Sequence, residues 1–407
     1  MNEPIKFAVI GAGINGAAVA RELSNRYPES SVTVFEKSSD PGAHQTGHNS
    51  GVVHAGLYYE PGSLKARLCR RGVELLKAYA TEKKLPYEEC GKLVVALNDQ
   101  DEERLKDIYA RSVANKVPGV ALLGEDEIRE IEPNAHGTLA LHSPETAITD
   151  YAAIARSFIE DVRQQGGIVR LSTEVLDIES TESSVIVTST HGSEEFDYLV
   201  TCAGLQSDRL ARMAGGAEYP VIVPFFGQYL QLPTEYEKVT NGLIYPVPDP
   251  KYPFLGVHLT KRVDGAMLVG PNAFLSFGRE TYSGLGFNLR DSIDIARELG
   301  FWRFALQNAP AATRELRGVL SRRQFIDSAA VYVPIVEGAK GTPLTRGIRA
   351  QAMAEDGSLI DDFVIEHVGR STLIRNAPSP GATSSLAIAE YIVDELERAH
   401  GLQSSNS

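Results

Sequence analysis

Residues 6–37 read KFAVIGAGINGAAVARELSNRYPESSVTVFEK, and this stretch decides how the chain begins to fold. Phe7–Ile10 is a short apolar run, which predicts a buried parallel strand. Residues 17–26 predict a helix, and the turn between the two carries glycines at G-x-G-x-x-G spacing: Gly11, Gly13 and Gly16. Such glycines allow a tight turn, a close backbone approach and a closely packed helix, whose N-terminus then faces a pyrophosphate.

A second strand is predicted over residues 32–35 and ends at Glu36, which lies 20 residues after Gly16. A carboxylate at this place binds a hydroxyl of an adenosine ribose and opposes a 2′-phosphate, which argues against NADP. A glycine turn without a ligand is the competing interpretation of a lone G-x-G-x-x-G motif. The position of the motif between strand and helix, with the acidic residue in register, favours a bound dinucleotide, either NAD or FAD.

The composition bounds the class of protein. The chain has 407 residues, which predicts two domains, and its 43% hydrophobic and 23% charged residues are typical of a globular protein. The 40 basic and 53 acidic residues give a net charge of −13, which disfavours a nucleic-acid partner.

The cysteines and the apolar runs bear on the compartment. Cys69, Cys90 and Cys202 are widely spaced without a C-x-x-C pattern, so we expect free thiols in a reducing compartment and no metal site. No run approaches the ~18 apolar residues that a membrane-spanning helix needs. We therefore expect a cytoplasmic protein without a transmembrane segment, and peripheral contact with a membrane stays open.

Apolar periodicity predicts the remaining elements. The helices are expected at 64–83, 99–115, 124–131, 150–166, 291–307, 313–328 and 384–400. The strands are expected at 90–97, 168–171, 174–180, 184–190, 195–201, 221–232, 255–269, 348–353, 363–368 and 372–376. The strand at 195–201 runs into TCAG (201–204), and this order of helix, strand, hairpin and strand-Ala-Gly is typical of flavoproteins rather than of regular βαβ dehydrogenases.

A second glycine- and hydroxyl-rich loop, APSPGATSS (377–385), leads into the last predicted helix. It predicts a second site for an anion or a carbonyl oxygen, although an ordinary helix cap would have the same composition. Two such helix starts suit FAD, one at the pyrophosphate and one at the O2/N1 edge of the flavin. The loop contains no cysteine, so we expect FAD to be bound non-covalently.

Longer motifs resemble one family. HQTGHNSGVVHAGLYYEPGSLKARLC (44–69) resembles the signature of the L-2-hydroxyglutarate oxidases/dehydrogenases, which are FAD enzymes of the D-amino-acid oxidase superfamily. The resemblance implies oxidation of L-2-hydroxyglutarate to 2-oxoglutarate, with hydride passing from C2 to flavin N5 and electrons then passing to a quinone, another acceptor or O2. The match continues along the chain in CGKLVVA (90–96), LIYPVPDPKYPFLGVHLT (243–260), VGPNAFLSFGRETY (269–282), GIRAQA (347–352), DGSLIDDF (356–363) and NAPSPGATS (376–384). Only residues 283–346 match the family weakly.

The same resemblance implies the architecture. We expect a mixed α/β (α+β) protein with a glutathione-reductase-like, FAD-binding Rossmann domain and an inserted substrate domain built on a mixed antiparallel sheet. The FAD domain would comprise residues 1–85, 145–218 and 335–407, and the substrate domain residues 86–144 and 219–334.

Two histidines are candidates for the base that accepts the proton of the C2 hydroxyl, because imidazole titrates near neutral pH. His258 ends the strand-like FLGVH and resembles an active-site histidine of sarcosine oxidases, which makes it the preferred base. His54 lies in HAG, where related glycerol-3-phosphate dehydrogenases carry a His-Gly-Gly run beside the flavin. Arg349 in GIRAQA resembles the arginine that binds the anionic end of the substrate, and Lys65 is expected to be the second cation for the small dicarboxylate.

The glycine motif and the resemblance together predict which residues bind FAD. Val175 would pair its backbone with adenine, residues 203–204 would close over the ribityl chain, and residues 380–383 would meet the flavin carbonyls. The full set of expected cofactor-binding residues is Gly11, Gly13, Ile14, Asn15, Gly16, Glu36, Lys37, His44, Thr46, Asn49, Ser50, Gly51, Val53, Val175, Ala203, Gly204, Pro380, Gly381, Ala382 and Thr383.

One departure and two rival functions stay open. Where the family usually shows Pro-Phe-Arg-Gly-Glu, this chain has PFFGQ (224–228), so that Phe226 and Gln228 replace an arginine and a glutamate. If the missing charges recognise the substrate or the acceptor, those details differ here. An amine or amino-acid oxidase on the same scaffold is one rival, and a flavin-bearing binding or tRNA-modification partner is the other, although the acidic charge counts against the latter.

Overall fold

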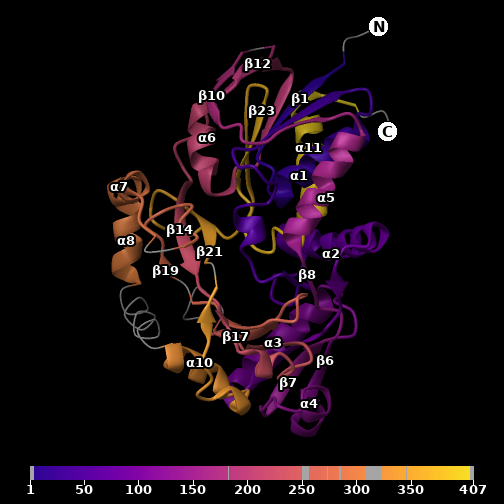
Figure 1. Cartoon of the computed structure of the whole chain (residues 1–407), viewed down its shortest axis with the longest axis vertical. Coiled ribbons are helices and arrows are strands. Elements are labelled where there is room, and N and C mark those ends of the chain that lie inside the picture. Colours follow the sequence, from indigo (N-terminus) through magenta and orange to yellow (C-terminus); the bar gives the residue numbers. More distant parts are fainter. Residues whose placement is uncertain are drawn as a thin grey trace.

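A computed structural model of the chain describes residues 4–181, 183–249, 256–272, 274–283, 286–308, 322–344 and 346–403. Figure 1 shows a region built on a parallel sheet at the top and a region built on a mostly antiparallel sheet at the bottom, hereafter the parallel half and the antiparallel half. In the described part of the chain, no helix is long and apolar enough to cross a membrane.

The parallel half is built on a six-stranded sheet in the order β22-β23-β13-β1-β2-β9. All neighbouring strands run parallel except the edge strand β22, which pairs antiparallel with β23. The strands are β1 (Lys6–Ile10), β2 (Ser31–Phe35), β9 (Ile168–Arg170), β13 (Tyr198–Thr201), β22 (Val364–Val368) and β23 (Ser371–Asn376).

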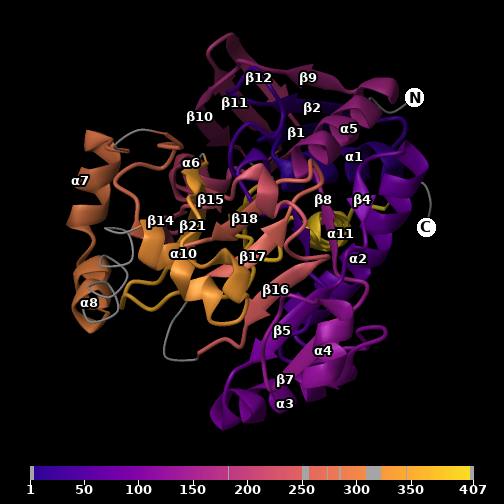
Figure 2. The same cartoon turned by 60° about the horizontal axis from the view of Figure 1, so that its bottom comes forward.

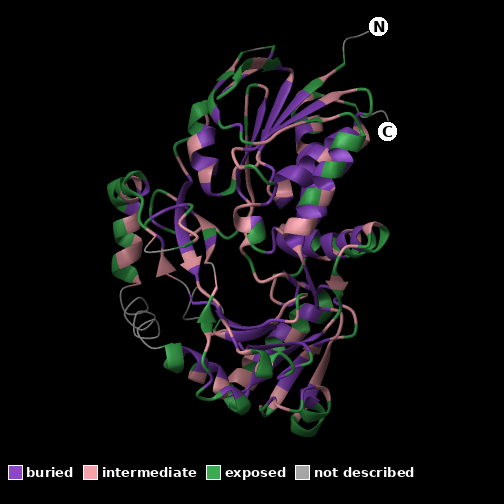
Figure 3. Ribbon diagram, viewed as in Figure 1, coloured by how far each residue is buried: buried purple, intermediate pink, exposed green. Residues whose placement is uncertain are grey.

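Both faces of this sheet are covered, as its near-continuous apolar strands require. On one face, Phe7 and Val9 pack with α1 (Ile14–Arg26), α5 (Tyr151–Gln164) and α11 (Ser385–His400), and α2 (Leu64–Lys83) lies against α11. On the other face, Ala8 and Ile10 pack with α6 (Ser207–Met213) and with a three-stranded meander. The meander comprises β10 (Val175–Ser180), β11 (Val185–Ser189) and β12 (Gly192–Phe196). Figure 3 shows the buried strands between exposed outer helix faces.

The antiparallel half is built on an eight-stranded sheet in the order β20-β15-β18-β17-β16-β5-β7-β6, in which only β16 and β5 pair parallel. Along β5, Leu93 and Val95 pack in the apolar core shared with α10 and α4, while Val94 and Ala96 pack with α3. Figure 2 shows α3, α4 and β5 at the end of this half. The elements are β5 (Lys92–Ala96), β6 (Ala121–Gly124), β7 (Leu139–Ser143), β15 (Leu230–Gln231), β16 (Leu243–Pro246), β17 (His258–Lys261), β18 (Met267–Gly270), β20 (Thr342–Pro343), α3 (Asp99–Ala114), α4 (Glu125–Ile131) and α10 (Arg322–Ala330).

Two small sheets lie between the halves. β14 (Val221–Gly227) pairs antiparallel with β21 (Gly347–Met353) and β19 (Phe274–Leu275), and helices α7 (Leu289–Arg297) and α8 (Leu299–Gln307) lie on its outer side (Figure 1). β8 (Ala147–Thr149) pairs with β3 (Val52–Val53) and β4 (Tyr87–Glu88). Short 3-10 turns complete the chain at η1 (Gln45–Gly47), η2 (Gly204–Gln206), η3 (Thr234–Tyr236) and η4 (Pro334–Val336).

The mixed α/β class and most predicted elements are confirmed. The helix predicted over 64–83 is found with the same bounds, because Ser63 accepts a hydrogen bond from the Ala66 amide at its start and Lys84 ends it in the left-handed conformation. The expected domain boundaries stay predictions. The structure adds that β20 pairs with β15, which associates Thr342–Pro343 with the eight-stranded sheet.

Four predicted elements are wrong in extent: three single strands are each divided into two strands, and one helix is interrupted. The strand predicted at 195–201 is split into β12 and β13, since the Asp197 amide bonds to Lys6 and the chain changes sheets there. The segment 221–232 divides into β14 and β15, which belong to different sheets, and 255–269 contains the β17–β18 hairpin with residue 255 outside the described residues. The predicted helix 291–307 is interrupted at Glu298, whose backbone is extended. Of the helix predicted at 313–328, residues 313–321 lie outside the described residues.

Candidate functional site

The glycine turn after β1 is shaped by close backbone contacts. Gly11 has a φ of +103°, and a Cβ there would lie 2.5 Å from the Cys202 carbonyl oxygen, at the end of the neighbouring strand β13. A Cβ on Gly16 would lie 2.0 Å from the carbonyl oxygen of Gly11, so only glycine allows α1 to start this close to the strand. Gly13, by contrast, faces only the Thr46 hydroxyl at 3.4 Å, which leaves its backbone open to a ligand.

The N-terminus of α1 is lined by groups that suit a dinucleotide. The Ile14 amide donates to the Thr46 hydroxyl over 2.9 Å. Glu36 accepts the amides of Ala12 and Ser38, one on each carboxylate oxygen, both at 2.8 Å. Because each carboxylate oxygen has two lone pairs, Glu36 is fixed in place by the backbone and still has capacity to accept ribose hydroxyls.

A cavity of about 320 Å³ opens beside this helix start, at the carboxyl ends of β1, β2 and β13, where ligands bind in open α/β sheets. Among the residues that line it, His44 has a buried Nδ1 without a hydrogen-bond partner in the described structure. The unpartnered Nδ1 of His44 and the open backbone at Gly13 therefore fit the adenosine and pyrophosphate of the expected FAD. The expected cofactor residues that line the cavity are Gly11, Gly13, Glu36, Lys37, His44, Thr46, Val175, Ala203 and Gly204.

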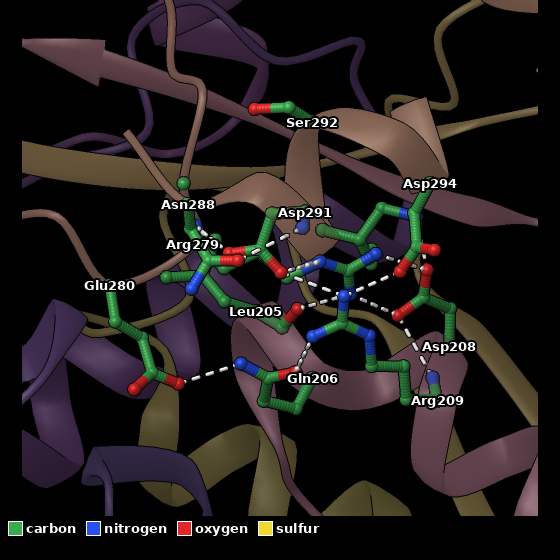
Figure 4. Close-up of polar contacts among 12 residues, drawn as sticks. Leu205, Gln206, Asp208, Arg209, Arg279, Glu280, Asn288, Asp291, Ser292 and Asp294 are labelled. Atoms are coloured by element: carbon green, nitrogen blue, oxygen red, sulfur yellow. Dashed lines mark hydrogen bonds and ion pairs between the residues drawn. The ribbon is translucent and has the colours of Figure 1, made fainter. Parts of the chain in front are cut away.

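An ionic network closes the far wall of this cavity (Figure 4). Glu280 pairs with Lys37 at the rim and also accepts the Gln206 amide over 2.6 Å. Behind it, the buried guanidinium of Arg279 donates to both oxygens of Asp208, which lies on α6. Arg209 on the same helix joins the cavity wall to α7, since it donates to Asp291 at 2.7 Å and to Asp294 at 2.5 Å. The network thereby fixes the parallel half to the segment that carries Glu280.

The two loops expected to hold the flavin are bonded to each other. The Thr383 hydroxyl accepts the His54 amide at 3.1 Å and shares a hydrogen bond with the Tyr151 hydroxyl at 2.9 Å. Tyr151 in turn donates to the Val52 carbonyl. Other expected members lie on the same loops or on the first turn of α1: Ile14, Asn15, Gly16, Asn49, Ser50, Gly51, Val53, Pro380, Gly381 and Ala382.

His258 lies on β17 at the edge of this region, with its side chain buried against the Tyr245 ring, whose centroid is 3.7 Å away. Its Nδ1 is 2.8 Å from the Gly256 carbonyl oxygen. A carbonyl can only accept, so Nδ1 carries the hydrogen and Nε2 of the neutral ring is the proton acceptor. The backbone therefore selects the tautomer that a general base requires.

Positive charges gather around both histidines. Burial, together with the charges of Lys92 and Arg349, lowers the pKa of His54 to about 3. Burial likewise lowers the pKa of His258 to about 3, with Lys92 and Arg349 again adding to the shift. The structure thus brings His54, His258 and Arg349 within electrostatic reach of one another, and both imidazoles are neutral at pH 7.

The other expected cation, Lys65, has a partner of its own. Its Nζ lies 2.6 Å from the carboxylate of Asp361, whose side chain is largely exposed. Phe226, which replaces the usual arginine, stacks near Phe274 at 5.4 Å, and the guanidinium of Arg346 lies 4.8 Å from its ring centroid. An arginine is therefore present at this place, although residue 226 is neutral.

Sequence reasoning missed Lys92 and Tyr245. Lys92 is the first residue of β5, all of whose residues are buried, and burial lowers its pKa to about 7. The available signal was an ionisable residue at the head of a continuous apolar strand. Its relation to His258 was not available, because β5, β16 and β17 meet only in the folded sheet.

Comparison with known proteins agrees with this geometry. The DAO family, described as FAD dependent oxidoreductase, matches residues 6–395. The mitochondrial L-2-hydroxyglutarate dehydrogenase of Bos taurus is 41% identical over 407 residues, which cover 96% of this chain and 88% of that protein. L-2-hydroxyglutarate dehydrogenase of Escherichia coli (strain K12) is 38% identical over 400 residues, which cover 98% and 94%.

Solved structures share the fold at low identity. The FAD-bound L-alpha-glycerophosphate oxidase of Mycoplasma pneumoniae superposes with a TM-score of 0.76 at 22% identity and covers 97% of this chain and 95% of its own. Glycine oxidase from Geobacillus kaustophilus superposes with a TM-score of 0.72 at 19% identity, with 98% and 95% coverage.

Proposed function

The chain belongs to the DAO family of FAD-dependent oxidoreductases, and we propose that it oxidises L-2-hydroxyglutarate to 2-oxoglutarate. Two relatives of that name, from an animal and a bacterium, match nearly the whole chain at about 40% identity. The observation in this chain that carries the proposal is the buried His258, whose Nε2 is left as a proton acceptor between cationic side chains.

The parallel half would hold FAD. The open backbone at Gly13 and the N-terminus of α1 would face the pyrophosphate, Glu36 would bind the ribose, and the loop around Thr383 would meet the flavin carbonyls. When bound, FAD takes up the hydride that leaves C2 of the substrate. The chain's own residues supply position, charge and proton transfer.

His258 acts as the base for the C2 hydroxyl. Its Nδ1–H is held by the Gly256 carbonyl, so the proton of the substrate hydroxyl passes to Nε2 while C2 becomes a carbonyl carbon. In the free pocket the low pKa keeps the ring unprotonated at neutral pH. A bound dianion raises that pKa, because a negative charge nearby favours imidazolium, and this makes His258 a better base when the substrate is present.

Arg349 anchors the C1 carboxylate. It lies on β21, where it is opposite Phe225 of β14, and its positive charge reaches both histidines. A planar guanidinium matches a carboxylate in two parallel hydrogen bonds, which would fix the C2 hydroxyl toward His258. His54 lies beside the reacting centre and contributes through its position next to Thr383.

Anaerobic mixing with each substrate tests the proposal. L-2-hydroxyglutarate should bleach the 450-nm flavin band rapidly, and the D-isomer should leave it unchanged, since only one face of C2 presents its hydrogen correctly. Bleaching by L-glutamate instead would assign an amino-acid oxidase to this scaffold and contradict the proposal.

Each substrate molecule releases two electrons, so an acceptor is required. A quinone, another carrier and dioxygen stay predictions, as do a cytoplasmic location and peripheral contact with a membrane. Reoxidation rates of the reduced enzyme with dioxygen and with a soluble quinone, measured side by side, rank these acceptors.

A further inference from the structure

Lys92 is buried, and the part of the chain that the structure describes places no counter-ion beside it. Its residue is 3% exposed, and Nζ lies 3.7 Å from the ring centroid of Tyr245 and 4.9 Å from that of Tyr58. Among the described residues, no carboxylate lies within 4.0 Å of this amine. Burying an ammonium without a paired anion is costly, and tyrosine faces offset only part of that cost. An anionic ligand beside this amine would offset the remaining cost.

Lys92 and the proposed base lie on the same face of the eight-stranded sheet. Val94 is opposite Tyr245 in the β5–β16 pair, and Lys92 shares a face with Val94 because it lies two residues before it. Ile244 is opposite Leu259 in the β16–β17 pair, so Tyr245 is opposite His258. The Lys92 ammonium, the Tyr245 ring and the His258 ring consequently form one stack, with both separations at 3.7 Å.

Space remains next to the amine. A cavity of about 10 Å³, roughly the size of one water, lies between β5 and the segment that carries His54. Lys92, Tyr58, His54 and Thr146 are among its lining residues. Room for about one small polar group therefore lies between the Lys92 amine and the segment that carries His54.

We propose that Lys92 binds the C5 carboxylate of the substrate and thereby selects dicarboxylates over monocarboxylates. This assignment rests on the proposed function, since a 2-hydroxydicarboxylate needs one cation at each end. Arg349 serves the C1 end, and the other expected cation, Lys65, is already paired with Asp361. The charges of Lys92 and Arg349 both act on His54 and on His258, so both cations lie near the proposed base.

Comparing substrates with and without the distal carboxylate tests the role proposed for Lys92. Lys92→Met keeps most of the length and the apolar character of the side-chain stem and removes the charged amine. The Michaelis constant for L-2-hydroxyglutarate should rise about 10- to 100-fold, the range expected when a hydrogen bond to a charged group is lost. The Michaelis constant for L-2-hydroxybutyrate, which lacks the distal carboxylate, should change less than about 2-fold. Lys92→Arg, which retains a positive charge, should retain part of the discrimination.

A matched control is available on the same sheet. Lys261 on β17 pairs with Glu88 at the surface, so Lys261→Met should change neither Michaelis constant. Lys65→Met addresses the rival assignment. If it, and not Lys92→Met, removes the preference for the dicarboxylate, the proposal is overturned.

Binding without turnover gives an independent readout. Glutarate and butyrate carry no hydroxyl to oxidise, and their dissociation constants can be measured from the perturbation of the flavin absorbance. Lys92→Met should weaken glutarate about 10- to 100-fold and leave butyrate unchanged. Equal weakening of both, or a lower kcat with unchanged Michaelis constants, would overturn the assignment. Failure of the proposed function is seen separately, in a wild-type enzyme that L-2-hydroxyglutarate does not reduce.

Discussion

The two halves of the molecule treat buried charge differently. In the parallel half, Glu36 accepts two backbone amides, Asp161 pairs with Arg21 and Lys83, and Arg375 pairs with Glu366. On the inner face of the antiparallel half, His258 and Lys92 are buried with no carboxylate within 4.0 Å among the described residues. The buried charges of the parallel half are satisfied within the chain, whereas the unpaired groups of the antiparallel half lie where we propose that a charged substrate completes the site.

The largest effect is expected from a substitution that disrupts the folding of the parallel half. In Gly16→Val, the side chain would overlap the Gly11 carbonyl, so we expect loss of bound FAD together with loss of the cooperative thermal transition. The ratio of 450-nm to 280-nm absorbance and the melting curve measure both.

Gly13→Ala is the matched control for that change. Its Cβ would meet only the Thr46 hydroxyl at 3.4 Å, so the protein should fold and bind FAD more weakly. A folded, yellow Gly16→Val protein would contradict the role given to the glycine turn.

A smaller loss of stability is expected where the ionic network joins the parallel half to the segment that carries Glu280. Arg279→Met leaves the buried carboxylate of Asp208 without its ion pair, and breaking a buried pair costs about 3–5 kcal/mol. Denaturant unfolding measures the free energy of unfolding.

Arg209→Met provides the comparison for Arg279. The pair of Arg209 with Asp294 is partly exposed, and Asp291 would still accept a hydrogen bond from the Arg279 amide. The free energy of unfolding should therefore fall by only ~1 kcal/mol. Equal losses in the two variants would show that burial does not decide the strength of this joint.

The effect expected to be smallest is a gain in the free energy of unfolding rather than a loss. The pKa of Lys92 is about 7 in the folded protein against an ordinary 10.5, so the unfolded chain binds more protons between these values. The destabilisation by Lys92 is therefore largest at or below pH 7 and disappears as the pH approaches 10.5. Lys92→Met should raise the free energy of unfolding by ~1–2 kcal/mol at pH 7 and by less at pH 10.

Lys83→Met is the control for this stability change, because Lys83 pairs with Asp161 at 2.5 Å in the parallel half. It should show no gain that depends on pH in this range. If Lys92→Met gained the same free energy of unfolding at pH 7 and at pH 10, burial of the Lys92 ammonium would not destabilise the folded protein.

Local signals in the sequence predicted the parallel half well. The turn after β1, the acidic residue after β2 and the bounds of α2 each depend on residues within one or two elements. The split at Asp197 was missed, because it depends on the pairing of β13 with β1 almost 200 residues earlier in the chain.

The pocket was predicted only in part for the same reason. His54, His258 and Arg349 were named as candidates because each lies in a motif that resembles a family, and their roles stay predictions. Lys92 lies in such a motif too, but its meaning depends on its burial against Tyr245, which the fold alone determines.

The most direct test of the account is the rate of flavin reduction in two variants, His258→Asn and His54→Asn, measured by stopped flow under anaerobic conditions with L-2-hydroxyglutarate. Both should retain FAD, because the parallel half holds it. Reduction should slow ~10²-fold or more in His258→Asn, and far less in His54→Asn, since only His258 has its tautomer fixed by a backbone carbonyl. Equal and small effects in the two variants would contradict the assignment of the base and the division of roles between the halves.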